Sequence, residues 1–142
     1  MNESDFDFAS LDIAAAADRG AELHVRDPIS GQPLEVNGAS VTIRLAGEDS
    51  GAYRHHERAA INRRLENRQR NKVTAESLET DTINALAAVT LGWSNIGLDG
   101  QDLPFNQANA RTLYRRFHWL REQVNEFVAT RANFLPKLST NS

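Results

Sequence analysis

The sequence predicts an α+β fold: a small N-terminal antiparallel β-hairpin or meander, followed by a mainly α-helical C-terminal part of about four helices. Three observations predict this order. Residues 21–46 contain short runs in which apolar and polar residues alternate, separated by Pro, Gly and Asn-Gly. Residues 51–72 lack proline and are rich in helix formers. Further along, residues 107–128 repeat apolar residues at the spacing of an amphipathic helix.

The chain has 142 residues, which is the size of one ordinary domain. Composition divides it into a flexible acidic N-terminal segment (1–20), a single domain (21–137) with strands at 21–46 and helices at 50–137, and a C-terminal tail (138–142). Within the first segment, residues 11–20 can form one or two helical turns that end at Gly20.

Alternation marks each strand of the predicted meander. The first strand ends at Asp27-Pro28, because proline cannot donate to a β-ladder. The dipeptide Asn37-Gly38 tolerates positive φ and predicts a tight turn before the last strand. The apolar positions of the three strands are Leu23 and Val25; Leu34 and Val36; and Val41, Ile43 and Leu45.

Side chains that can cap helix N-termini mark the helices. Asp49-Ser50 precedes the helix predicted over 51–72, and a second helix begins near Thr74 and ends near Gly92. Residues 93–106 have the composition of a loop. Asn106 can cap the next helix, in which Leu113, Phe117, Leu120 and Val124 follow the spacing of an amphipathic helix.

The net charge of −3 is mild, but the charges are segregated. Residues 1–50 carry ten acids and three basic residues, whereas residues 51–72 carry seven basic residues and two acids. A basic helix can follow a nucleic-acid backbone, yet no aromatic residues interleave with these arginines to stack bases. We therefore favour a solvated or protein-contacting face, which the acidic N-terminal region could neutralise within the protein or between copies.

No residue pattern indicates catalysis. The chain has no cysteine and neither a glycine-rich phosphate loop nor a Gly-x-Ser-x-Gly elbow. The four histidines, which are His24, His55, His56 and His118, show no specific metal-ligand spacing. We expect no enzyme, no cofactor and no metal. The most apolar stretch, Ile83 to Leu91, is about half as long as a bilayer span, so we expect no membrane partner.

Taken in order, four motifs resemble phage tail assembly chaperones. They are RDPISGQP (26–33), GEDSGAYR (47–54), LGWSNIGLDGQDLPFNQANARTLY (91–114) and REQVNEFVATRANFLPK (121–137). The resemblance covers about 21–137. Asn106 stands where Ser or Thr is commoner in the family. Arg116-Phe117-His118 stands where many relatives begin the last helix with proline, so here the helix either runs on unbroken from residue 107 or starts slightly differently.

The resemblance implies a protein that acts in the cytoplasm of an infected bacterium. Such chaperones coat the long helical tape-measure protein, keep it soluble, help to recruit tail-tube subunits and leave before the particle is finished. In relatives a frameshifted longer form carries the tube-binding extension. Many copies act together, so self-association is expected.

The apolar stretch 93–105 either fills a gap in the core or forms a partner surface, because aromatic residues are favoured at interface hot spots. On the second interpretation, the client-contacting residues are Trp93, Ile96, Leu98, Phe105 and Tyr114, with Arg58, Arg63, Arg64 and Arg68 contacting the client or a neighbouring copy. Two other functions stay open. One is a structural tail or head-tail connector protein retained in the virion, and the other is a nucleic-acid-binding regulator that uses the Arg-rich helix.

Overall fold

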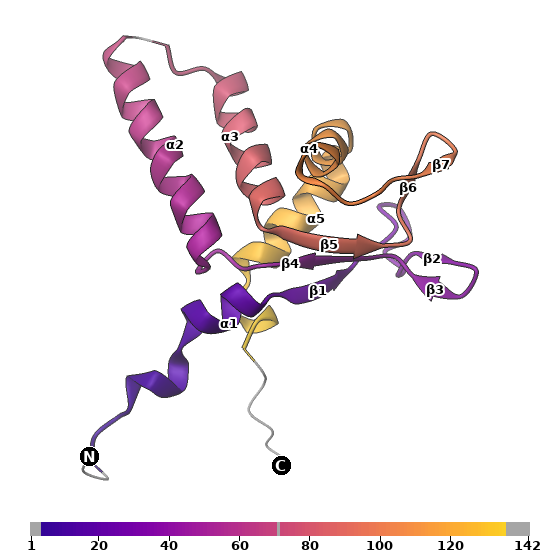
Figure 1. Ribbon diagram of the computed structural model, residues 1–142, viewed down its shortest axis with the longest axis horizontal. Coiled ribbons are helices and arrows are strands. Elements are labelled where there is room, and N and C mark those ends of the chain that lie inside the picture. Colours follow the sequence, from indigo (N-terminus) through magenta and orange to yellow (C-terminus); the bar gives the residue numbers. More distant parts are fainter. Residues whose placement is uncertain (1–3, 71, 136–142) are drawn as a thin grey trace.

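The computed structural model describes residues 4–70 and 72–135, and it has the predicted α+β architecture. A three-stranded antiparallel sheet has the order β1-β4-β5, with bounds Ala21–His24, Thr42–Leu45 and Thr90–Ser94. Four helices follow the N-terminal strands, namely α2 (Gly51–Gln69), α3 (Ala75–Ala88), α4 (Gln107–Arg116) and α5 (His118–Ala129). As Figure 1 shows, α2 and α3 rise side by side from the sheet as a helical hairpin.

The N-terminal helical turns are confirmed. A 3₁₀ turn, η1 (Phe8–Leu11), precedes α1 (Ile13–Arg19), and Gly20 ends α1 with a φ of 82°. Ala16 and Ala17 are buried, and the Gly47 N–H donates to the Ala17 carbonyl at 3.1 Å. Although the whole of 1–20 was predicted to be flexible, α1 is packed against the body.

The predicted antiparallel strands are confirmed, although β1 pairs directly with β4 and not with the strand that follows it in the chain. Between β1 and β4 lies a second hairpin, formed by β2 (Glu35–Val36) and β3 (Ala39–Ser40). Asn37 and Gly38 form its turn with φ of 51° and 80°, as the dipeptide predicts. In β4, Ile43 and Leu45 are fully buried while Arg44 between them is exposed, which is the period of a half-buried strand.

The prediction for residues 89–106 was partly wrong. Helix α3 ends at Ala88, and β5 then pairs with β4 across the sheet, with Ile43 opposite Trp93. A two-stranded ribbon follows, formed by β6 (Gly97–Leu98) and β7 (Gln101–Asp102). Composition missed these strands because their pairing partners, rather than their own residues, stabilise them.

The predicted caps lie where the sequence places them. The Ser50 hydroxyl accepts from the Tyr53 N–H at 3.2 Å, and the Asn106 side chain accepts from the Asn109 N–H at 2.7 Å. Thr74 and Ser77 form a reciprocal capping box at the start of α3.

The helix that begins at residue 107 does not run on unbroken. Phe117 has extended backbone angles, with φ −113° and ψ 91°, and separates α4 from α5. After α5, a 3₁₀ turn, η2 (Arg131–Asn133), leads to the buried Phe134. The predicted tail at 138–142 lies outside the described residues, as does the end of the predicted domain at 136–137.

One hydrophobic core joins the sheet to the helices α3, α4 and α5. Its fully buried members include Ile43, Leu45, Ile83, Leu86 and Val124. Helix α2 contributes little, since Ala60 is its one buried residue. None of the helices in the described part of the chain has the length and apolar character that crossing a membrane requires.

Candidate protein-binding site

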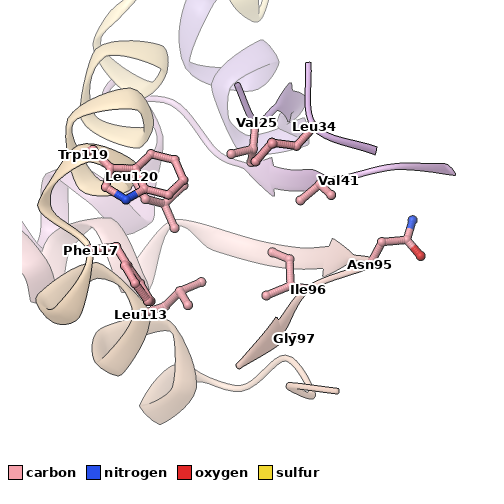
Figure 2. Close-up of a pocket in the computed structure, with 10 residues that line it drawn as sticks. All are labelled: Val25, Leu34, Val41, Asn95, Ile96, Gly97, Leu113, Phe117, Trp119 and Leu120. Atoms are coloured by element: carbon pink, nitrogen blue, oxygen red, sulfur yellow. The ribbon is translucent and has the colours of Figure 1, made fainter. Parts of the chain in front are cut away.

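An apolar groove opens between the sheet end and the junction of α4 with α5 (Figure 2). It has a volume of about 210 Å³. Val25, Leu34 and Val41 form one wall, and the opposite wall comes from the α4–α5 junction. The ten lining residues, which define the groove, are Val25, Leu34, Val41, Asn95, Ile96, Gly97, Leu113, Phe117, Trp119 and Leu120.

The break at Phe117 shapes the helical wall of this groove. An uninterrupted helix would place Phe117 and Leu120 on adjacent turns of one straight surface. With the extended residue between the helices, Phe117, Trp119 and Leu120 all line the same hollow. The Phe117 and Trp119 rings meet edge to face, with centroids 6.4 Å apart.

Arg121 stabilises the break. Its Nη1 donates to the Tyr114 carbonyl at 3.2 Å, which lies in the last turn of α4. Its Nη2 pairs with the Glu79 carboxylate of α3 at 3.0 Å. The guanidinium is largely buried and so joins three helices at one point. No motif in the sequence distinguishes this arginine from the exposed ones.

Two side-chain amides fix the position of segments next to the groove wall that Val25, Leu34 and Val41 form. Gln123 of α5 accepts from the Arg26 N–H at 3.0 Å and donates to the Arg26 carbonyl at 2.8 Å. Asn95, with a φ of 63°, donates to the Ser40 carbonyl at 2.8 Å. These bonds connect segments far apart in the sequence, so the groove is a preformed feature of the fold.

Of the residues predicted to contact a client, Ile96 lies in the groove. Trp93 and Phe105 instead pack edge to face with ring centroids 5.1 Å apart, and the Trp93 Nε1–H donates to the Leu103 carbonyl at 2.8 Å. Both rings are half-buried, and this pair folds the 95–105 segment against the sheet. Leu98 is half-buried in β6.

Tyr114 was predicted to contact a client, and this prediction was wrong. The residue has 0% exposure, so it cannot contact a partner. Its hydroxyl lies 2.7 Å from the Thr90 hydroxyl, which donates to the Leu86 carbonyl at 2.8 Å. Since the Thr90 hydrogen is used there, Tyr114 is the donor of the pair. Burial raises the pKa of Tyr114 well above its ordinary value. Its helical spacing is that of a core position, which sequence alone does not separate from an interface position.

The predicted arginines divide into two groups. Arg63 and Arg64 both bind Asp81 of α3, at 3.0 and 3.2 Å, which joins α2 to α3. Arg58 and Arg68 are exposed, and neither belongs to an ion pair among residues 4–70 and 72–135.

A second apolar depression lies on the helical hairpin, away from the groove. We call it the hairpin cleft, and its lining is Ile61, Arg64, Leu65, Arg68, Val73 and Leu78. It has a volume of about 420 Å³. Two of these residues, Arg64 and Arg68, are among the arginines that the sequence analysis names as candidate contacts.

The described residues include no group of three or more His, Asp or Glu side chains placed to hold a metal ion. The groove itself offers mainly apolar side chains and one amide, Asn95, so its chemistry is that of hydrophobic contact. Comparison with known proteins finds no matching family model, no matching curated protein and no matching solved structure.

Proposed function

We propose that this protein is a tail assembly chaperone of a long-tailed phage, which binds the tape-measure protein in the host cell cytoplasm. The observation that carries the proposal is the preformed apolar groove, which is open to solvent and lined by residues next to the strand ends, by the 95–97 segment and by the α4–α5 junction. The motif resemblance supports the choice of client. Recruitment of tail-tube subunits belongs to the same proposal.

The size of the groove favours a protein client over a small molecule. Sites for small ligands have volumes of about 300–1,000 Å³ and place several polar groups to orient the ligand. The groove is smaller, at about 210 Å³, and offers apolar walls. It suits one or two apolar side chains on the face of a helix. One such contact is weak and reversible, so a long client needs many copies.

The proposal is tested by co-expressing the chain with the tape-measure protein encoded near it, followed by pull-down and size-exclusion chromatography with light scattering. We expect the client to be soluble only with this chain. The variant pair Ile96→Ser and Trp119→Ser, at the two sides of the groove, should abolish this effect. Ile29→Ser is the matched control, because Ile29 is 95% exposed and lies outside the groove.

Thermal unfolding must show that each groove variant is folded. A client that stays insoluble with the wild-type chain contradicts the proposal, as does a folded groove variant that solubilises it fully. Mass spectrometry of purified particles gives a separate check. A stoichiometric amount of this chain in the virion would favour a structural tail protein instead.

Nucleic-acid binding is less well supported, because Arg63 and Arg64 are already engaged with Asp81. Binding through the remaining basic residues would weaken steeply with salt. Measuring DNA affinity at two salt concentrations therefore separates this alternative from a chaperone.

A further inference from the structure

We propose that the acidic N-terminal arm, residues 4–12, of one copy docks into the hairpin cleft of a second copy. The arm and the cleft are two exposed apolar surfaces of opposite charge on one chain, and the proposed function uses neither of them. The inference stands independently of the client that the groove binds.

The hairpin cleft is an apolar surface with a basic border. Leu65 is 54% exposed, and Ile61, Val73 and Leu78 are also exposed, which is unusual for four neighbouring aliphatic residues. Arg68 is exposed beside them. Segment 51–72, which supplies the α2 side of the cleft, has five more basic residues than acidic ones.

The arm has the complementary composition. Phe6 is 60% exposed and Phe8 is 80% exposed, and their rings meet edge to face at 5.2 Å. Asp5 and Asp7 alternate with Phe6 and Phe8, and Asp12 is the last residue of the arm. Asp7 and Asp12 cap η1 and α1, but no arm carboxylate forms an ion pair in the part of the chain that the structure describes. The arm therefore presents two aromatic anchors with unneutralised negative charge.

The geometry favours a second copy over the arm's own cleft. The Gly51 N–H donates to the Asp18 carboxylate at 2.9 Å, so α1 is fixed at the base of the helical hairpin. The cleft begins at Ile61, which is ten residues along α2 and thus about 15 Å from that base. The arm leaves α1 in the direction opposite to the hairpin (Figure 1), so docking in its own cleft would require the chain to reverse at Asp12.

Arm and cleft are different surfaces, so the contact is heterologous. Each copy has one of each, and repeated docking produces a closed ring or an open chain of copies. Aromatic anchors in an apolar hollow supply the affinity, and the segregated charges fix the orientation.

The test uses the full chain with two variants that each lose one partner surface. The arm variant is Phe6→Ser/Phe8→Ser, and the cleft variant is Leu65→Asp/Arg68→Asp. All four positions are exposed, so both variants are expected to fold, which circular dichroism and thermal unfolding verify. Light scattering and sedimentation velocity should show that the wild type associates and that each variant alone is monomeric, with a dissociation constant raised at least tenfold.

Mixing the two variants is the decisive measurement. The arm variant retains a cleft and the cleft variant retains an arm, so the mixture should form a one-to-one dimer that cannot grow. Raising the salt from about 0.05 M to about 0.5 M should weaken it several-fold, because the charges are exposed. Ile29→Ser should associate as the wild type does.

Three results would overturn the proposal. A wild type that is monomeric at all concentrations has no such contact. Folded variants that still associate as the wild type does would place the contact elsewhere. Monomeric variants whose mixture forms no dimer would show that the arm of one copy does not bind the cleft of another.

Discussion

At the scale of single residues, the buried hydroxyl pair of Tyr114 and Thr90 shows how a polar group is accommodated in this core. Both side chains are buried, and each hydroxyl has a partner, because Tyr114 donates to Thr90 and Thr90 donates to the Leu86 carbonyl. A satisfied hydroxyl costs little to bury, whereas an unpaired one is destabilising. Tyr114 therefore contributes through its ring volume and through one hydrogen bond.

We predict that Tyr114→Phe lowers the free energy of unfolding by about 1 kcal/mol, because it removes one hydrogen bond and leaves the ring in place. Tyr114→Ala should lower it by about 3–5 kcal/mol, because it also leaves a cavity. Urea denaturation followed by tryptophan fluorescence measures both values. Equal losses for the two variants would show that the hydroxyl, not the ring, dominates.

At the scale of elements, the break between α4 and α5 is the feature on which the groove depends. Next to the break, the Arg121 guanidinium donates a hydrogen bond to the Tyr114 carbonyl. The same guanidinium also pairs with Glu79 of α3. A single long side chain therefore fixes the relative position of three helices. This arrangement explains why a cationic residue stands at a largely buried position of α5.

We predict that Arg121→Met destabilises the protein by about 2 kcal/mol, because the Tyr114 carbonyl loses its donor while the apolar stem is retained. Arg115→Met, at an exposed position in the last turn of α4, is the matched control and should change stability little. Thermal unfolding of both variants measures the difference. If Arg121→Met were as stable as the control, some other contact would hold the break.

At the scale of the whole molecule, side-chain contacts connect distant parts of the chain. Arg131 of η2 binds the Asp49 carboxylate at 2.7 Å, and Asp49 directly precedes the cap of α2. Gln123 joins α5 to Arg26, which lies two residues after β1. The N-terminal, central and C-terminal parts are thus mutually dependent.

The ion pair between Arg131 and Asp49 predicts that stability depends on pH. The hydrogen bond from Arg131 lowers the pKa of Asp49, and the positive charges of Arg131 and Arg54 act in the same direction, against the effect of burial. Because the folded-state pKa is below the ordinary value of about 3.9, the contribution is complete above that pH and is lost as the pH falls through the lowered pKa.

Thermal unfolding of the wild type and Asp49→Asn from pH 7 downward tests this prediction. The wild type should have the higher Tm at pH 7, and the difference should disappear in acid. Asp102→Asn is the control, because Asp102 is exposed and forms no ion pair among the described residues. A difference that is independent of pH would mean that charge is not the cause.

The sequence by itself determined the elements whose signals are local. The caps at Ser50, Thr74 and Asn106 and the turn at Asn37-Gly38 act within a few residues, so their chemistry can be read from the chain. The same is true of the alternation in β4, which identifies Ile43 and Leu45 as core residues.

Only the tertiary structure decided the features that depend on distant partners. Thr90–Ser94 is a strand because β4 pairs with it, and the Tyr114 hydroxyl can be buried because Thr90 lies beside it as a hydrogen-bond partner. The break at Phe117 depends on Arg121 and Glu79, so a repeat of apolar residues could not reveal it. The groove likewise depends on residues from distant segments of the chain. Its walls are far apart in the sequence, and a pattern in one segment carries no information about the side chains that another segment brings to it.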